Sequence, residues 1–156
     1  MLYSILKKCE LTTPIGEKIG KINDLLVDAR ETPWTVKKIT LKTRRMPGKS
    51  FTYPIDHVGK VNKTRKNVRV TAYVEPETPP SLSKVDTMFL GDLTKKTAVT
   101  EDGEKIGKIY DFDVSTLTKP WTVEKVLIKT GTRKRRLRIS VDRVKTIEKN
   151  VTIKPE

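Results

Sequence analysis

The sequence predicts an all-β protein in which two tandem small β-barrels are joined by a proline-rich linker. The segment Gly16–Ile22 recurs letter for letter as Gly103–Ile109. Alignment of residues 6–43 with residues 93–130 at a constant offset of 87 gives 19 identities in 38 positions. Both copies contain short alternating or β-branched segments between glycine turns. Since such a repeat determines architecture, we expect a first barrel at 1–74, an acidic linker at 75–86 and a second barrel at 87–156.

A glycine turn opens each copy. Gly103 follows an aspartate, and an Asp-Gly pair supplies the positive φ of a tight hairpin turn; Gly16 takes the same place in copy one. The isoleucines of the following strand are three residues apart, which a period of two does not place on one face. We therefore expect a β-bulge at Gly20 and at Gly107. Bulges of this kind let short strands curl, as a small barrel requires.

The second half of each copy predicts a β-branched strand, a basic turn, an alternating strand and one helical turn. Asp56 and Asp142 precede valine or isoleucine pairs spaced three apart, so we expect each aspartate to cap that turn. A short closing strand follows. The apolar positions that match between the copies form the predicted core: Ile22, Val27, Ile39, Leu41, Ile55, Ile109, Val114, Val126, Ile128 and Val141.

Composition limits the kind of protein and its partners. One cysteine, Cys9, excludes an internal disulfide, and one histidine, His57, leaves no Cys/His cluster for zinc. No apolar run approaches the ~18 residues of a membrane span, and residues 1–9 lack the apolar core of a signal peptide. The sequence thus predicts a cytoplasmic protein without a transmembrane segment. Its net charge of +14 favours acidic partners.

The repeated motifs resemble those of the PRC-barrel family. The resemblance is carried by Asp102–Ile109, by Trp121-Thr122-Val123 and by the later Val141–Val144, with matching residues in copy one. The family includes the photosynthetic reaction centre H subunit and the C-terminal half of the RimM ribosome-maturation factor. Tandem PRC-barrels are typical of archaea, where proteins of the CdpB group act with SepF, the membrane anchor of FtsZ, in cell division. The family is not known for catalysis, so the resemblance implies a docking module without a cofactor.

A basic run near the end of copy two is the sharpest local feature. Alternation is expected to bury Leu137 and Ile139, so that Arg136 and Arg138 point outward. Such a patch suits a polyanion such as RNA, an acidic protein or anionic lipid, and a plain solvated surface is the alternative interpretation. The candidate patch comprises Arg133, Lys134, Arg135, Arg136 and Arg138, with Arg44 and Arg45 at the matching place in copy one.

Aromatic residues give a second candidate, a partner surface of Trp34, Trp121, Tyr110 and Phe112. Tryptophan is frequent at interface hot spots. However, Trp34 and Trp121 follow a proline at the same place in both copies, which favours packing in the core or between the barrels.

Two aspartates of copy two invite a metal or acid–base interpretation. Asp111 and Asp113 fall on one face of an alternating strand, but copy one has Leu26 in place of the second aspartate. A solvated strand face is therefore the favoured interpretation. No arrangement of nucleophile, base and oxyanion donors is found, and we expect no catalysis.

The sequence thus predicts a non-enzymatic adaptor in archaeal FtsZ-based cell division. The expected partner is SepF or another PRC-barrel protein, at the division site, and a homodimer is also open. The alternative is an RNA-binding factor in ribosome maturation or RNA processing. A peripheral membrane protein would need a lipid-insertion element, which is not found. The two copies differ most at positions 23, 25 and 26 against 110, 112 and 113, and in the turn Lys60–Lys66, where a partner would discriminate between them.

Overall fold

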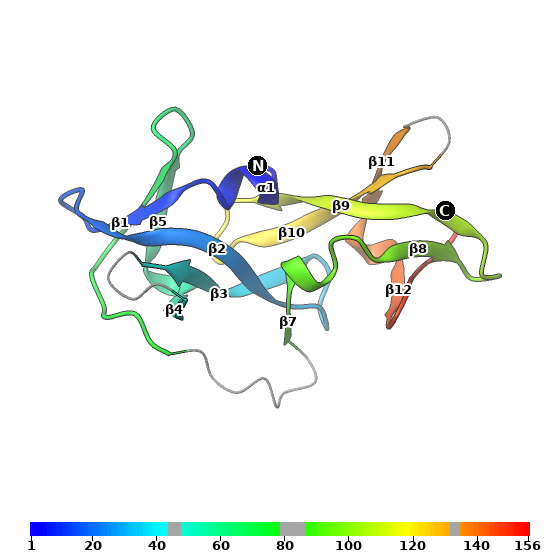
Figure 1. Ribbon diagram of the computed structural model, residues 1–156, viewed down its shortest axis with the longest axis horizontal. Helices are drawn as coiled ribbons and strands as arrows, with labels where there is room; N and C mark the ends of the chain where they lie inside the picture. The colour runs from blue at the N-terminus through cyan, green and yellow to red at the C-terminus, as the bar shows by residue number, and fades with distance from the viewer. Residues whose placement is uncertain (44–47, 79–86, 132–134) are drawn as a thin grey trace.

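The structure is a computed structural model of the 156-residue chain, described here for residues 1–43, 48–78, 87–131 and 135–156. The molecule is elongated, with copy one at the left and copy two at the right of Figure 1. Four predicted patch residues, Arg44, Arg45, Arg133 and Lys134, lie outside the described residues, as do residues 79–86 of the linker. Within the described part of the chain, no helix has the length and apolar character needed to cross a bilayer.

The two copies follow the same order of elements, except that copy one opens with a helix and copy two opens with a short strand and a 3-10 turn. Copy one contains α1 (Tyr3–Leu6), β1 (Glu10–Thr12), β2 (Lys18–Asp28), β3 (Trp34–Lys42), β4 (Ser50–Pro54), the 3-10 turn η1 (Ile55–His57), β5 (Val58–Asn62) and β6 (Asn67–Val70). Copy two contains β7 (Thr87–Phe89), η2 (Leu90–Asp92), β8 (Thr97–Thr100), β9 (Lys105–Ser115), β10 (Thr122–Lys129), β11 (Arg136–Ser140), η3 (Val141–Arg143), β12 (Val144–Ile147) and β13 (Val151–Ile153).

The all-β prediction is confirmed, but closed barrels are not. Copy one pairs its strands in the order β4-β3-β2-β1-β6-β5, and copy two repeats this as β11-β10-β9-β8-β13-β12. Among the described residues no ladder joins β4 to β5 or β11 to β12. The 3-10 turns η1 and η3 follow β4 and β11 in place of a hairpin turn, so the chain does not fold back on these strands. Each copy is therefore an open, curled sheet.

The bulges lie one residue before the positions predicted for them. The β1–β2 ladder skips Ile19 and the β8–β9 ladder skips Ile106, and each isoleucine precedes a predicted bulge glycine. The glycines are needed for a different reason. A Cβ atom on Gly107 would collide with the carbonyl oxygen of Lys129, and one on Gly20 would lie 3.1 Å from the corresponding oxygen of copy one. Close approach of a neighbouring backbone thus explains why both copies carry glycine here.

The predicted turns and core are confirmed, whereas the caps are not. Gly16 and Gly103 have φ values of +90° and +86°. Asp56 and Asp142 lie inside η1 and η3, which begin one residue earlier, and no side chain caps either turn. The residue at the N-cap position is instead Pro54 in copy one and Ser140 in copy two, and both have an extended backbone. All ten predicted core residues are buried: Ile22, Val27, Ile39, Leu41, Ile55, Ile109, Val114, Val126, Ile128 and Val141.

The two copies meet directly in one continuous 13-stranded sheet. At this seam β3 pairs with β10, with Thr35 opposite Thr122 and Trp34 opposite Val123. The N–H of Val36 donates to the carbonyl oxygen of Trp121 at 2.8 Å. Thr35 and Thr122 hold equivalent positions, so the contact is self-complementary, like that of a two-fold dimer. The copies are therefore joined by backbone pairing within one sheet as well as by the linker.

Each copy also sends its first residues onto the other copy. We call residues 1–6 and 87–92 the arms. In arm one, Leu2 forms a β-bridge with Asp113 of β9. In arm two, Phe89 of β7 pairs with Leu26 of β2. Phe89 lies 87 residues after Leu2, and Asp113 lies 87 residues after Leu26. The two contacts are therefore equivalent, and the exchange of arms is reciprocal.

Candidate docking site

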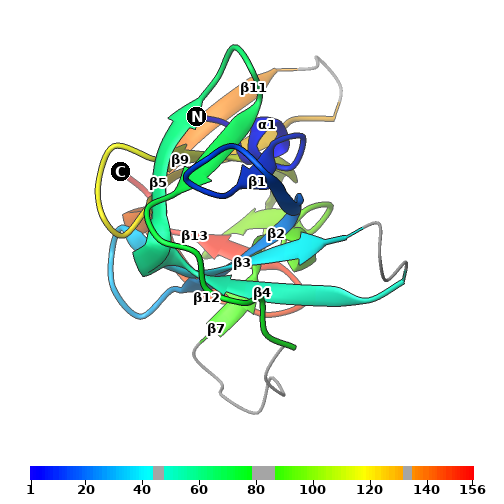
Figure 2. The ribbon, with the colours of Figure 1, turned by 90° about the vertical axis from the view of Figure 1, so that its left-hand side faces the viewer.

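A groove of about 610 Å³ opens where arm one crosses onto copy two. Figures 1 and 2 both place α1 on the same side of the molecule as the β5–β6 turn and β11. We call this feature the basic groove. Its lining residues come from both copies: Met1, Leu2, Ile5, Lys8, Lys63, Lys66, Asp113 and Arg138.

The apolar lining of the groove is Met1, Leu2 and Ile5, and Ile5 lies on α1, which is anchored by its buried face. Tyr3 and Leu6 of this helix are buried, while Ile5 is 39% exposed. Ser4 fixes the helix to copy two, because its N–H donates to Oδ1 of Asp111 at 3.0 Å and its hydroxyl donates to Oδ2 at 2.5 Å. The helix therefore presents Ile5 to the solvent as a fixed apolar contact.

Asp111 is a structural acceptor and not part of a solvated strand face. Its residue exposure is 4%, and its Oδ1 also accepts the N–H of Phe112 at 2.9 Å. Three donors thus converge on one carboxylate, which corrects the expectation from strand alternation. The ladder with β10 is regular from Asp111 to Asp113, so the alternation holds there, and Asp111 is buried because arm one docks on it.

Tyr3 connects the same helix to copy one. Its hydroxyl donates to Oδ1 of Asp24 at 2.7 Å, and its ring meets Phe112 edge-on with centroids 5.8 Å apart. Desolvation, followed by the hydrogen bond to Asp24, raises the pKa of Tyr3 well above its ordinary value, so Tyr3 remains a donor. Desolvation also raises the pKa of Asp24, although its hydrogen bonds act in the opposite direction. The helix α1 is thus held by contacts to both copies.

The charge of the groove is predominantly positive. Lys8, Lys63 and Lys66 are exposed on its copy-one side, and Arg138 is exposed on its copy-two side. Asp113 is the carboxylate among the lining residues, and it lies 3.4 Å from the terminal ammonium of the chain and 3.5 Å from Nη1 of Arg138. Asp113 is therefore partly exposed and ion-paired. Among the described residues, Lys8, Lys63 and Lys66 form no ion pair, so their positive charges remain available to a ligand.

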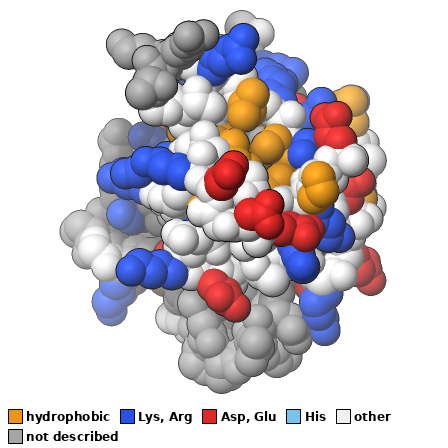
Figure 3. Space-filling model, turned by 90° about the vertical axis from the view of Figure 1, so that its right-hand side faces the viewer, with side chains coloured by type: hydrophobic (Ala, Val, Ile, Leu, Met, Phe, Trp, Pro, Cys, Tyr) orange, Lys and Arg blue, Asp and Glu red, His pale blue; other side chains and the backbone are white. Residues whose placement is uncertain are grey.

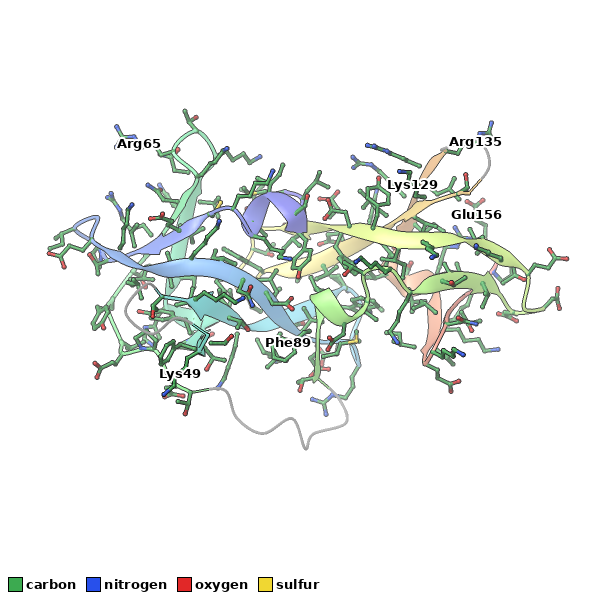
Figure 4. All side chains as sticks on the ribbon, viewed as in Figure 1. Lys49, Arg65, Phe89, Lys129, Arg135 and Glu156 are labelled. Atoms are coloured by element: carbon green, nitrogen blue, oxygen red, sulfur yellow. The ribbon has the colours of Figure 1, made fainter. Side chains whose placement is uncertain are left out.

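The described part of the predicted basic patch borders this groove. Arg135, Arg136 and Arg138 are exposed and Ile139 is buried, as alternation predicts, whereas Leu137, which was also expected to be buried, is half-buried. The guanidinium of Arg136 lies over the ring of Tyr110, 5.5 Å from its centroid. Arg135 lies at one end of β11 and Arg65 in the β5–β6 turn, on the side of the molecule that carries α1 (Figure 4).

Basic residues do not dominate every face. Figure 3, which views the right-hand end of Figure 1, shows basic, acidic and hydrophobic side chains interspersed. This end carries ion pairs such as that between Lys145 and Glu101, at 3.7 Å. The groove therefore differs from this face in having several cations and one carboxylate, which is already paired.

Most of the predicted partner surface is buried. Trp34 and Trp121 are each 2% exposed at the seam, and Phe112 is 0% exposed under α1. These three residues offer no surface to a partner, because packing between the copies uses them. Tyr110 is half-buried under Arg136 and remains at the surface.

The groove residues of arm one were missed as a site, whereas the β5–β6 turn was expected to be a place where a partner discriminates between the copies. Lys63 and Lys66 belong to the Lys60–Lys66 turn, where copy one has three more residues than copy two. That difference between the copies was the available signal. Lys8 and Ile5 gave no signal, because their position depends on the crossing of the arm. Within the described residues, no group of three His, Cys, Asp or Glu side chains is placed to hold a metal ion.

Comparison with known proteins identifies one domain. Residues 85–156 match the family model described as PRC-barrel domain. No curated protein matches the chain. Copy two therefore carries a PRC-barrel domain, and the match begins at residue 85, two residues before copy two, and extends to residue 156.

Proposed function

We propose that the protein is a non-enzymatic adaptor that docks an acidic segment of a partner protein in the basic groove. The observation that carries the proposal is the groove itself, in which the exposed Ile5 lies among Lys8, Lys63 and Lys66. An apolar contact surrounded by cations suits an amphipathic acidic segment, because the apolar contact adds affinity and the charges add rate and specificity.

The proposal extends to the first copy and to the kind of partner. Copy one repeats the PRC-type motif of copy two and places its bulges at equivalent positions, which supports a second, diverged PRC-type unit. The CdpB-type resemblance then favours SepF, or another PRC-barrel protein, as the partner and the cytoplasmic face of the division site as the location. A second copy of the chain is a further candidate partner.

Binding of purified full-length protein to candidate partners, measured by calorimetry, tests this function. Lys63→Glu should weaken binding about tenfold or more, because it places a like charge opposite an acidic partner. Lys21→Glu is the matched control, since Lys21 is exposed on β2 and does not line the groove. It should leave the affinity unchanged within about twofold. The proposal fails if neither SepF nor PRC-barrel partners bind at ~100 µM.

RNA is the second candidate ligand, favoured by the net charge of +14. The described residues that line the groove include no aromatic side chain on which a base would stack, which is why we rank it second. Structured RNA that bound below ~1 µM in physiological salt, with an affinity falling steeply as salt rises, would support this alternative. Lys63→Glu should then reduce the salt dependence by about one unit of slope.

A further inference from the structure

The linker covers the outer strand of copy one. Thr52 of β4 and Glu77 form an isolated antiparallel bridge. The N–H of Thr52 donates to the carbonyl oxygen of Glu77 at 2.7 Å, and the N–H of Glu77 donates back at 3.0 Å. The outward N–H and carbonyl of Thr52, in the middle of β4, are thus satisfied by an acidic segment of the chain itself.

The equivalent strand of copy two has no such cover. In β11, Arg138 lies opposite Leu127, just as Thr52 lies opposite Thr40 in β4. The described residues pair β11 with β10 and with no other strand. We call the other side of this strand the β11 edge. By the register of Thr52, the N–H and carbonyl of Arg138 point outward along it.

The side chains of β11 determine which strand this edge accepts. Arg136 and Arg138 are exposed on one face of the strand, and the intervening Leu137 is half-buried on the other. Pairing with β11 of a second copy would bring like charges opposite one another, which is unfavourable. A strand with acidic residues at alternate positions would instead place them opposite the arginines.

We propose that the β11 edge binds an extended acidic segment of a partner protein as an added antiparallel strand. Alternate acidic residues of the partner lie opposite Arg136 and Arg138, and the backbone groups of Arg138 make the bonds that Thr52 makes to Glu77. The linker gives the chemical precedent, since Glu75 and Glu77 alternate in it. This inference rests on the proposed adaptor function and specifies how its partner is held.

Amide hydrogen exchange and chemical shifts of the full-length protein test the proposal. The probe is the acetylated and amidated peptide Thr-Glu-Val-Glu-Val-Thr, with a dissociation constant expected at about 0.1–1 mM. At saturation the N–H of Arg138 should exchange at least about tenfold more slowly than in the free protein. The N–H of Thr52 is the internal reference and should not change, because it is already bonded to Glu77.

Two controls separate strand addition from simple charge attraction. A peptide that is N-methylated at alternate residues keeps its charge but loses the bonds to the edge, and it should not bind. Arg136→Glu should weaken the peptide about tenfold, and Lys21→Glu should have no effect. Arg136 does not line the basic groove, so its variant reports on the edge alone.

Three results would overturn the proposal. They are equal binding of the methylated peptide, unchanged exchange of the Arg138 N–H at about 2 mM peptide, which is about twice the upper end of the expected dissociation constant, and chemical-shift changes confined to Lys8 and Lys63. The last would leave the adaptor function intact with the groove as the docking site. Conversely, strand addition at β11 without binding of any partner protein to the chain would refute the adaptor function and leave the edge as proposed.

Discussion

Asp24 and Asp111 are equivalent residues of the two copies, and each accepts a backbone N–H from the arm of the other. Gly91 donates to Asp24 at 3.1 Å, and Ser4 donates to Asp111 at 3.0 Å. Each carboxylate also accepts the N–H of the residue that follows it, at 2.8 Å in copy one and 2.9 Å in copy two. The two aspartates therefore hold the exchanged arms in place. Each copy has its central aspartate bonded by residues of the other copy.

The first prediction concerns Asp111. Asp111→Ala should lower the free energy of unfolding by about 2–3 kcal/mol, because it leaves the N–H groups of Ser4 and Phe112 without their charged acceptor. Urea unfolding measures this. Asp142→Ala is the control, since Asp142 is exposed and its side chain forms no hydrogen bond or ion pair among the described residues; its effect should stay within about 0.5 kcal/mol. Equal effects of the two substitutions would contradict a fastening role.

A pair of glycines offers a steric test of the same contact. A Cβ atom at Gly91 would lie 2.5 Å from Oδ2 of Asp24 and 3.3 Å from the hydroxyl of Tyr3, whereas one at Gly131 would meet nothing within 4 Å. Gly91→Ala should destabilise the protein by about 1–3 kcal/mol. Gly131→Ala should be nearly neutral, within about 0.5 kcal/mol. A Gly91→Ala variant as stable as the parent would show that arm two is not seated on Asp24.

Asp28 predicts a pH dependence of stability. Arg30 donates to it from Nη2 at 2.6 Å and from its backbone N–H at 2.9 Å, and these bonds lower the pKa of Asp28 to about 2. Since the folded pKa lies below the value of 3.8 for an unperturbed aspartate, the stabilisation is present above pH ~4 and is lost as the pH falls toward 2. Asp28→Asn should therefore cost about 1 kcal/mol at pH 6, a figure kept small because Arg30 is largely exposed.

Urea unfolding midpoints of the parent and of Asp28→Asn, measured from about pH 2 to about pH 6, check this. That range spans both the folded and the unperturbed pKa of Asp28. The difference between the two proteins should shrink to zero at the acid end. Arg30→Gln should give a smaller difference with the same direction of pH dependence, since it removes the guanidinium donor but keeps the backbone N–H that donates to Asp28. A difference that is constant with pH would mean that the ion pair does not carry the stabilisation.

Separating the two copies should remove hydrogen bonds and strand neighbours that each copy needs in order to fold. A fragment of residues 1–78 loses Gly91 as donor to Asp24, β7 as neighbour of β2, and β10 as neighbour of β3. We expect the fragment to be unfolded or to associate with itself, using its own arm in place of arm two. Addition of residues 79–156 should restore a one-to-one complex. Size-exclusion chromatography with light scattering and circular dichroism would measure both, and a folded monomeric fragment would be the contrary result.

The sequence allowed the local features to be predicted because they are repeated. The turns at Gly16 and Gly103, the bulges beside Gly20 and Gly107, and the ten core positions all follow from patterns within a few residues. Two copies of the same pattern reduce the chance of an accidental match. The interpretation of Trp34 and Trp121 as packing residues rested on the same comparison, and their burial at the seam confirms it.

The contacts between the copies were not predictable in the same way. The pattern around Ser4 and Gly91 is too short to reveal a partner, and nothing local tells whether an arm docks on its own copy or on the other. Asp111 was misjudged for the same reason, since its burial depends on a donor 107 residues away. The groove, which depends on the crossing of arm one, could not be assembled from the sequence.

Differential scanning calorimetry of the full chain tests most directly whether the two copies form one unit. With exchanged arms and a shared sheet, the chain should unfold in one transition, with a calorimetric enthalpy equal to the van't Hoff enthalpy. Asp111→Ala should shift this whole transition to lower temperature. Two resolved transitions in the parent, or a shift of one half alone in the variant, would contradict the account and restore two independent domains.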